Sequence, residues 1–286
     1  ALQRQGYAVH AVDPCEGKLS LPTPVDVAFL ALHGTYGEDG QVQSELQRLG
    51  VAYTGSGPDA SRLAFDKARA KKVFMERGLP TPASAVISGA HQLLPEGLSL
   101  PLVVKPSCQG SSVGLHFVEK EKQWRPAIEQ VLSMGGTALV EQCIVGRELT
   151  VAILDGRAHP IVEIIPKDDA PYDYDHKYRL GATEYLCPAQ LDTFQTERCQ
   201  HIACQAYEAL GCAGYGRVDL LLDCHGPTLL EVNTLPGMTE TSLMPMAAQA
   251  SGIDFDALCQ WMVEDARKRH PAHAASVNPS QSAQLS

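Results

Sequence analysis

Apolar residues in the first part of the chain occur in short runs separated by polar turns. Tyr7–Val12 and Val25–Leu32 predict two strands, and the second is apolar almost throughout, as in a parallel strand covered on both faces. Helical spacing of apolar positions follows over Val42–Leu49, and then a short strand that ends at Tyr53. Strands alternating with helices in this way predict an α/β unit.

The opening residues of this unit are unusual for its class. An α/β sheet normally begins with a strand before its first helix, whereas Ala1–Gly6 have the pattern of a helix end and contain no initiator Met. We therefore expect the chain to be truncated at the N-terminus and to lack the first strand of its fold.

The pattern changes after a helix predicted at Asp66–Arg77, which Gly78 stops and an extended linker, Leu79–Pro82, follows. Strands then follow one another closely, which predicts antiparallel pairs and an α+β organisation. The expected strands are Ala83–Ile87, Pro101–Lys105, Leu115–Val118, Ala138–Gln142, Glu148–Leu154, His159–Ile165, Arg217–Asp223 and Thr228–Val232, and the expected helices are Trp124–Met134, Gln195–Leu210, Ser242–Ala250 and Asp254–Arg269.

These patterns divide the chain into units. We expect a partial N-terminal parallel α/β domain over residues 1–62, a central subdomain over 63–143 and a C-terminal subdomain over 144–270. Residues 271–286 are rich in Ser, Gln, Asn and Ala and are expected to form a flexible tail.

Composition excludes several classes of protein. The chain carries 23 Lys and Arg against 33 Asp and Glu, a net charge of −10, which offers no general attraction for nucleic acid or anionic lipid. No apolar run approaches the ~20 residues that span a bilayer. The nine cysteines are scattered without Cys-x-x-Cys spacing, which predicts reduced thiols in a cytoplasmic protein rather than disulfides or a zinc site.

Two common nucleotide motifs are also excluded. Gly55–Ala60 formally fits G-x-G-x-x-A, but Pro58 lacks an amide donor and no acidic residue stands about 20 positions later to bind a ribose. We expect only a turn there. The chain contains no G-x-x-x-x-G-K-[ST] sequence, so it has no P-loop.

A lysine followed by a glycine- and serine-rich loop is a candidate phosphate site. Lys105 ends an apolar strand and Pro106–Gly114 follows, with backbone amides and hydroxyls that can surround phosphate oxygens beside the Lys105 ammonium. The alternative is a flexible hairpin with a lysine at its edge.

Oxygen ligands gather on the last two predicted strands. Asp219 lies on one strand, and Glu231 and Asn233 lie two residues apart on the next, beyond a Gly226-Pro227 turn. Adjacent strands would bring the three together as ligands of the kind that Mg²⁺ prefers when it also contacts phosphates. An E-x-N pair by itself is more often a solvated strand face.

Seven ordered motifs between Tyr7 and Arg269 together resemble the D-alanine–D-alanine ligases of the ATP-grasp superfamily. The resemblance implies an ATP-grasp fold with a partial pre-ATP-grasp domain, a homodimer, and a role in peptidoglycan and cell wall biosynthesis. The motifs are His33–Gly40, Tyr53–Ser56, Lys105–Gly114, Gly146–Val151, Tyr172–Tyr178, Gly216–Asp219 and Glu231–Thr239 with Ser242 and Leu243.

Roles for single residues also come from this resemblance. It implies ATP binding by Lys67, Lys105, Lys177, Glu141, Glu148, Gly110 and Ser112, and binding of two Mg²⁺ or Mn²⁺ ions by Asp219, Glu231 and Asn233. It implies catalytic roles for Arg217, Ser111, Tyr178, Lys177, His33 and Gly237, and substrate contacts for Ser242, Leu243 and His33.

The implied reaction is ATP-dependent joining of two D-alanines through a D-alanyl phosphate. Tyr178 occupies the loop position at which ligases that use D-lactate carry histidine, so dipeptide synthesis is favoured. The family's N-terminal Gly-Gly-x-Ser-x-Glu segment, with a glutamate that binds the first D-alanine, is absent. The alternatives are a D-Ala–D-lactate ligase, another ATP-grasp carboxylate–amine ligase, and an inactive nucleotide-binding fragment.

Overall fold

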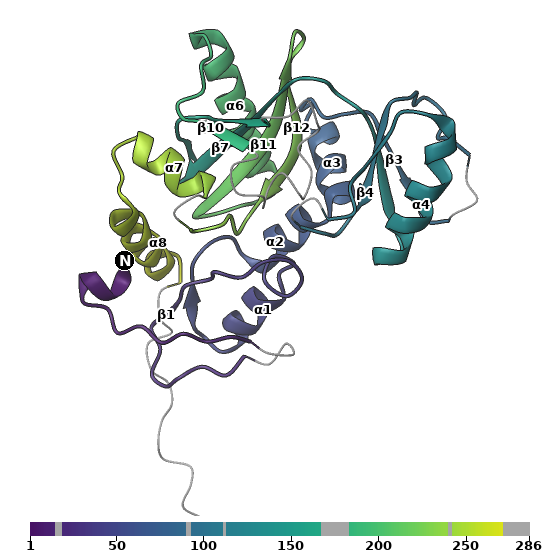
Figure 1. Ribbon diagram of the computed structural model, residues 1–286. Helices are drawn as coiled ribbons and strands as arrows, with labels where there is room; N and C mark the ends of the chain where they lie inside the picture. The colour runs from purple at the N-terminus through teal and green to yellow at the C-terminus, as the bar shows by residue number, and fades with distance from the viewer. Residues whose placement is uncertain (15–18, 90–92, 111–112, 167–182, 240–241, 271–286) are drawn as a thin grey trace, which may run out of the picture.

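The described part of the computed structural model contains three β-sheets with helices packed on them (Figure 1). No helix among the residues that the structure describes is long and apolar enough to cross a membrane. The described residues are 1–14, 19–89, 93–110, 113–166, 183–239 and 242–270.

The N-terminal part contains a small parallel sheet of β1 (Val27–Ala28) and β2 (Ala52–Tyr53), as the apolar run predicted. A short 3₁₀ helix, η1 (Leu2–Gln5), precedes the sheet and contacts helix α8 through Arg4 and Asp256. The other helices of this part are α1 (Gln41–Arg48) and α2 (Pro58–Phe65).

Two predictions for this part were wrong, and a third was right only over part of its length. The segment from Tyr7 to Val12 forms no strand, because its backbone pairs with no neighbour among the described residues and most of its side chains are exposed. The strand predicted at Val25–Leu32 pairs only where β2 lies beside it. The turn expected at Gly55–Ala60 instead opens helix α2, with Gly57 as N-cap and Pro58 in the first helical turn, where its missing N–H costs nothing.

A four-stranded antiparallel sheet forms the middle of the chain, in the order β3 (Ser84–Ile87), β6 (Ala138–Gln142), β4 (Leu102–Pro106), β5 (His116–Val118). Helix α4 (Glu121–Gly135) covers one face, where Leu102, Val104 and Val140 are buried. Because side chains alternate along a strand, Val103, Lys105 and Glu141 point to the other face. The antiparallel pairing predicted for these strands is confirmed.

The largest sheet has six strands, in the order β10 (Thr183–Leu186), β9 (Val162–Pro166), β7 (Arg147–Leu154), β11 (Tyr215–Asp223), β12 (Gly226–Asn233), with β8 (Arg157–Ala158) paired to β7. Helices α3 (Lys67–Glu76) and α6 (Thr193–Ala209) pack on one face. Helices α7 (Leu243–Ala250) and α8 (Phe255–Arg269) pack toward the other. Alternate residues of β7 accordingly belong to two different cores. Val151 packs in the core with α3 and α6, and Ala152 packs in the core with α7 and α8.

A β-bulge in the β11–β12 pair sets which β12 side chains face the site. Asp219 pairs with Glu231, but the next residue, Leu220, pairs with Leu229, so Leu230 is the extra residue. Leu229 is therefore buried in the core with Leu220, while Glu231 stays on the same face as Asp219. Without the bulge, Leu229 and Glu231 would point the same way.

Candidate active site

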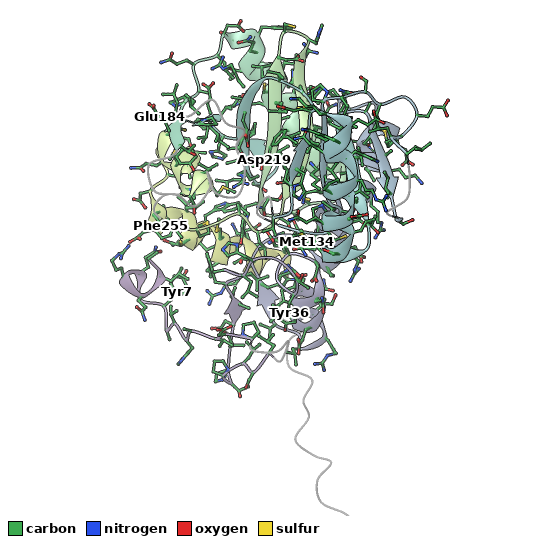
Figure 2. The ribbon with its side chains drawn as sticks, turned by 45° about the vertical axis from the view of Figure 1, so that its right-hand side comes forward. Tyr7, Tyr36, Met134, Glu184, Asp219 and Phe255 are labelled. Atoms are coloured by element: carbon green, nitrogen blue, oxygen red, sulfur yellow. The ribbon has the colours of Figure 1, made fainter. Side chains whose placement is uncertain are left out.

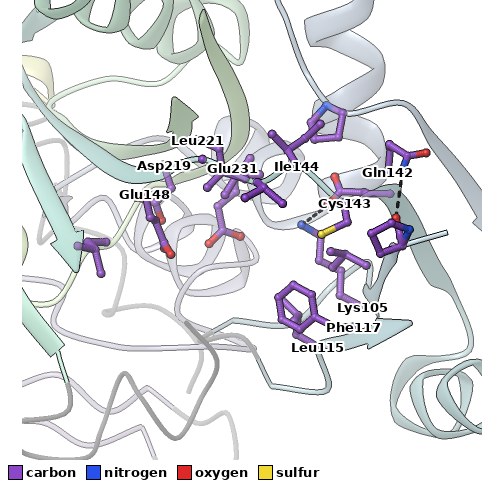
Figure 3. Close-up of a pocket in the computed structure, with 18 of the residues that line it drawn as sticks. Lys105, Leu115, Phe117, Gln142, Cys143, Ile144, Glu148, Asp219, Leu221 and Glu231 are labelled. Atoms are coloured by element: carbon purple, nitrogen blue, oxygen red, sulfur yellow. Dashed lines mark hydrogen bonds and ion pairs between the residues drawn. The ribbon is translucent and has the colours of Figure 1, made fainter. Parts of the chain in front are cut away.

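A cavity of about 670 Å³ lies between the four-stranded and six-stranded sheets, a size typical of small-molecule sites. Figure 3 shows Lys105, Leu115 and Phe117 on one side of it and Glu148, Asp219 and Glu231 on the other. Lys105, Asp219 and Glu231 therefore line one pocket, although they come from two different sheets. Asp219, which is labelled in Figure 2, is buried.

Lys105 reaches the pocket from the end of β4 and pairs with a buried carboxylate. Its Nζ lies 2.6 Å from Oε2 of Glu141 on the neighbouring strand β6. Oε1 of Glu141 lies 2.7 Å from Nζ of Lys71 on α3. Burial alone would raise the pKa of Glu141, but the Lys105 and Lys71 ammonium groups hold it below its usual value. Glu141 is thus an ionised group that helps to position Lys105.

Lys67 links the loop after β4 to the last strand of the large sheet. Its Nζ donates a hydrogen bond to the carbonyl of Gln109, 2.7 Å away, and lies 3.0 Å from Oε2 of Glu231. Burial alone would lower the pKa of Lys67, but Glu231 and its other acidic neighbours raise it above its usual value. Lys67 is therefore cationic in the same space as Lys105.

The first turn of α3 holds the loop after β4 in place. Asp66, the N-cap of α3, accepts hydrogen bonds from the Arg69 amide and from the Ser107 hydroxyl, the latter at 2.7 Å. Ser107 in turn accepts a hydrogen bond from the amide of Ala68. These contacts fix both ends of the Lys67–Gln109 bridge.

Arg217 and Asp219 form a two-point ion pair on β11. The guanidinium Nε and Nη2 lie 2.9 and 3.0 Å from the two carboxylate oxygens of Asp219. The Thr150 hydroxyl of β7 donates to the same carboxylate at 2.6 Å. Asp219 is buried and held rigidly, and Arg217 is 15% exposed, so the pair can face a ligand without moving far.

The oxygen ligands predicted for Mg²⁺ are brought together in part. Asp219 and Glu231 are direct cross-strand neighbours, and Asn233 lies opposite Arg217, with its Oδ1 accepting a hydrogen bond from the Leu235 amide. No cluster of three or more His, Cys, Asp or Glu side chains suited to a metal occurs in the described ranges. The predicted set instead combines two carboxylates with one amide oxygen, a set that fits Mg²⁺.

The charges of the pocket also fit a divalent cation bound with a polyanion. Among the residues that the structure describes, three cationic side chains line it against six carboxylates, so these residues alone would present a polyphosphate with an excess of negative charge. Divalent cations would offset that excess. The cations are Lys67, Lys105 and Arg147, and the carboxylates are Glu119, Glu141, Glu148, Glu163, Asp219 and Glu231.

Apolar side chains from both sheets line the rest of the cavity. Val103 and Phe117 belong to the four-stranded sheet, and Leu221 to the large one. Ile144 lies in the turn that joins β6 to β7 (Figure 3). Glu148 lies beside Leu221 in the sheet register, at the edge of this apolar region. A flat aromatic base fits between such walls, with a carboxylate near enough for a sugar hydroxyl.

A second group of predicted residues lies together after β12. A Cβ atom built on Gly237 would lie 2.8 Å from the hydroxyl oxygen of Ser242. That hydroxyl accepts a hydrogen bond from the amide of Thr239 at 2.9 Å, and Leu243 begins α7 with a buried side chain. Gly237 and Ser242 therefore lie close together, with Leu243 next to Ser242, but none of the three lines the cavity described above.

The loop before α1 brings a further carboxylate to the site. Glu38 accepts a hydrogen bond from the amide of Gly34 at 2.6 Å, and a Cβ built on Gly110 would lie 2.9 Å from its Oε2. Burial raises the pKa of Glu38, with smaller effects from the nearby His33, Glu231 and Lys67. His33 itself is exposed.

Four predicted residues cannot be placed. Ser111, Ser112, Lys177 and Tyr178 lie outside the described residues. Gly110, at the edge of the first gap, lies against Glu38 as stated above.

Two residues of the site were missed by the sequence reasoning, which assigned no role to Lys71 or Glu38. Lys71 follows Lys67 by four residues in a predicted helix, and this spacing places both ammonium groups on the same side of α3. That spacing was the available signal for Lys71. Glu38 stands within the quoted His33–Gly40 motif, but only the fold shows that it meets Gly110.

Two β-sheets that enclose a pocket lined by lysines on one side and paired carboxylates on the other define an ATP-grasp ligase. Family models bear this out. Residues 83–264 match the model described as "D-ala D-ala ligase C-terminus", and residues 6–56 match "D-ala D-ala ligase N-terminus". The chain belongs to the D-alanine–D-alanine ligase family.

Relatives and solved structures agree with this membership. The chain is 46% identical over 274 residues to a D-alanine–D-alanine ligase of Methylacidiphilum infernorum, covering 96% of this chain and 89% of that one. It is 41% identical over 263 residues to that of Acinetobacter baylyi, covering 91% and 85%. The crystal structure of the Bacillus anthracis ligase complexed with ATP superposes with a TM-score of 0.76 at 33% identity, covering 86% and 80%.

Proposed function

We propose that the pocket between the two sheets binds ATP and uses it to join two D-alanines into D-alanyl-D-alanine for peptidoglycan synthesis. The observation that carries this proposal is the meeting of Lys67 and Lys105 with Asp219 and Glu231 in a cavity of nucleotide size, with Arg217 paired to Asp219. The family membership supports the same reaction.

The two ends of the pocket suggest how the nucleotide lies. The base would occupy the apolar region between Phe117 and Leu221, with Glu148 beside the ribose. The triphosphate would then extend toward Lys67 and Lys105, whose ammonium groups offset its charge. Gly110 and Ser112 would contribute from the loop that Lys67 holds through the Gln109 carbonyl.

Glu141 takes a different place in this proposal from the one implied by the resemblance. Both of its oxygens pair with lysines and its side chain is 3% exposed. Its contribution to nucleotide binding is therefore mainly to hold Lys105, with any contact to the base made by its remaining lone pairs.

Asp219, Glu231 and Asn233 would hold Mg²⁺, or Mn²⁺, with ATP. When bound, the ions neutralise phosphate charge during transfer. Lys67 pairs with Glu231 and Arg217 pairs with Asp219, so these two cations hold the carboxylates in place beside the pocket.

The chemistry then has two steps. A carboxylate oxygen of the first D-alanine attacks the γ-phosphorus, the bond to ADP breaks, and an acyl phosphate forms. The amine of the second D-alanine attacks the carbonyl carbon and loses a proton, and the carbon–oxygen bond to phosphate breaks. Arg217 and the backbone amide near Gly237 would stabilise the oxyanion that develops in this second step.

The remaining predicted residues would position the two amino acids. Ser242 and Leu243 would contact the second D-alanine, and His33 would lie near the first substrate or the attacking amine. Ser111, Lys177 and Tyr178 complete the set by resemblance, with Lys177 near the γ-phosphate. Exclusion of water from the closed site protects the acyl phosphate from hydrolysis.

The test measures ADP release by the purified chain with ATP and Mg²⁺. Three substrate conditions are compared: D-alanine, L-alanine, and D-alanine together with D-lactate. We expect release that depends on D-alanine, with one dipeptide formed for each ADP and no product from L-alanine. Depsipeptide as the main product, increasing at low pH where the amine is protonated, would assign the chain to the D-lactate ligases instead. Nucleotide binding without any product would identify an inactive nucleotide-binding protein.

A further inference from the structure

Lys71 is buried more deeply than the other lysines at the site. Its side chain is 1% exposed, its Nζ lies 2.7 Å from Oε1 of Glu141, and it donates a hydrogen bond to the Thr81 hydroxyl at 2.6 Å. The Thr81 hydroxyl in turn donates a hydrogen bond to the Leu229 carbonyl of β12 at 3.0 Å. A buried ammonium loses its hydration and needs a compensating partner. Here that partner is Glu141.

Lys71 does not line the cavity, whereas Lys105 and Glu141 do. Lys71 and Lys105 bind opposite oxygens of one carboxylate, and the Lys105 side chain is 11% exposed. A ligand in the pocket can therefore meet the Lys105 ammonium directly but meets the charge of Lys71 only through Glu141.

The net charge of Lys71, Glu141 and Lys105 together determines how strongly Lys105 attracts an anion. Two ammonium groups and one carboxylate leave one net positive charge beside the pocket. If Lys71 were neutral, Glu141 would balance Lys105 alone and could hold it with both oxygens. The attraction for a polyphosphate would then fall, and Lys105 would be drawn toward β6.

We infer that Lys71 is a positioning residue for ATP. It balances the charge of Glu141 from outside the cavity and so leaves Lys105 free to bind the nucleotide phosphates. The inference rests on the proposed function in one respect, that the nucleotide occupies this pocket. It extends that function to a residue that touches neither nucleotide nor amino acid.

A double-mutant cycle tests the inference. Lys71→Met is made in the native chain and in a Glu141→Gln background, and the dissociation constant of a non-hydrolysable ATP analogue with Mg²⁺ is measured by calorimetry. In the native background we expect Lys71→Met to weaken binding by about tenfold, because Glu141 then pairs with Lys105 alone and neutralises it. In the Glu141→Gln background we expect less than about a threefold effect, since the group through which Lys71 acts is gone.

Steady-state kinetics supply a second readout. The KM for ATP should rise with Lys71→Met while the KM for D-alanine stays within about threefold. Lys72→Met is the matched control, because Lys72 is the next residue of α3 and makes only a surface contact with Glu76. We expect Lys72→Met to leave both values unchanged.

The outcomes separate the inference from its rivals. Equal weakening by Lys71→Met in both backgrounds, or no weakening in the native background, would overturn the positioning role. If Lys71→Met does not fold, Thr81→Val replaces it in the cycle, since it removes the hydroxyl that fixes Lys71 but keeps both charges. Its effect should likewise be confined to the native background. A native chain that binds the analogue but forms no dipeptide would contradict only the proposed function.

Discussion

Replacement of Arg217 by methionine should lower kcat for dipeptide formation by about 10²–10³-fold, the loss typical of removing one oxyanion donor. Arg217 presents its guanidinium from β11, fixed by two contacts with Asp219. Methionine keeps an unbranched stem like that of arginine but is shorter and supplies no donor and no charge. Because Asp219 also accepts the Thr150 hydroxyl, it keeps one partner in the variant.

The pattern of the loss identifies its cause. A group that acts in the transition state lowers kcat and leaves the KM for ATP within about threefold. The matched control is Arg125→Met, which removes a surface arginine whose Nε lies 2.8 Å from Glu129 on α4, and which should leave kcat unchanged. If Arg217→Met retains native kcat, or loses activity only in proportion to its loss of folded protein, Arg217 has no part in the chemistry.

Replacement of Glu231 by glutamine should raise the Mg²⁺ concentration for half-maximal activity by about 10–100-fold, the range found when a metal site loses a supporting group. Glutamine keeps the shape and one oxygen of Glu231 but removes the negative charge that faces Asp219 across the strands. It also removes the ionic partner of Lys67, 3.0 Å away. Activity should therefore recover in part at high Mg²⁺.

The measurement is a Mg²⁺ titration of dipeptide formation at saturating ATP and D-alanine. Glu76→Gln serves as the control, because Glu76 contributes only an exposed pair with Lys72 at the end of α3. A Glu231→Gln titration that superposes on the native one would remove Glu231 from the metal site, and a loss that high Mg²⁺ does not relieve would assign its effect to Lys67 instead.

The sequence predicted strands well where alternation was strong and a partner lay close in the chain. Strand β6 has the bounds predicted for it, Ala138–Gln142, and antiparallel pairing was expected for the strands of its sheet. The segment from Tyr7 to Val12 has strand-forming residues but no partner among the described residues, and pairing cannot be read from composition. Gly55–Ala60 was expected to be only a turn, although the first turn of a helix accepts a proline such as Pro58.

The site was predictable to the extent that its parts lie on neighbouring strands. Asp219 and Glu231 flank one hairpin, so their meeting followed from the sequence. The extra residue Leu230, which keeps Glu231 on the pocket face, left no signal in the pattern. Strands β3, β4 and β5 lie between Lys71 and Glu141 in the sequence, and only the tertiary packing shows that the two residues form an ion pair. Buried ion pairs of this kind are set by the fold rather than by local spacing.

The central claim is that the pocket uses ATP to activate a D-alanine carboxylate, and oxygen transfer tests it most directly. The chain is incubated with ATP, Mg²⁺ and D-alanine whose carboxylate carries ¹⁸O, and the phosphate and dipeptide are analysed by mass spectrometry. An acyl phosphate predicts one labelled oxygen in each phosphate released and one kept in the new amide. Unlabelled phosphate would mean that water attacked ATP, and the account of the site as a carboxylate-activating ligase centre would be contradicted.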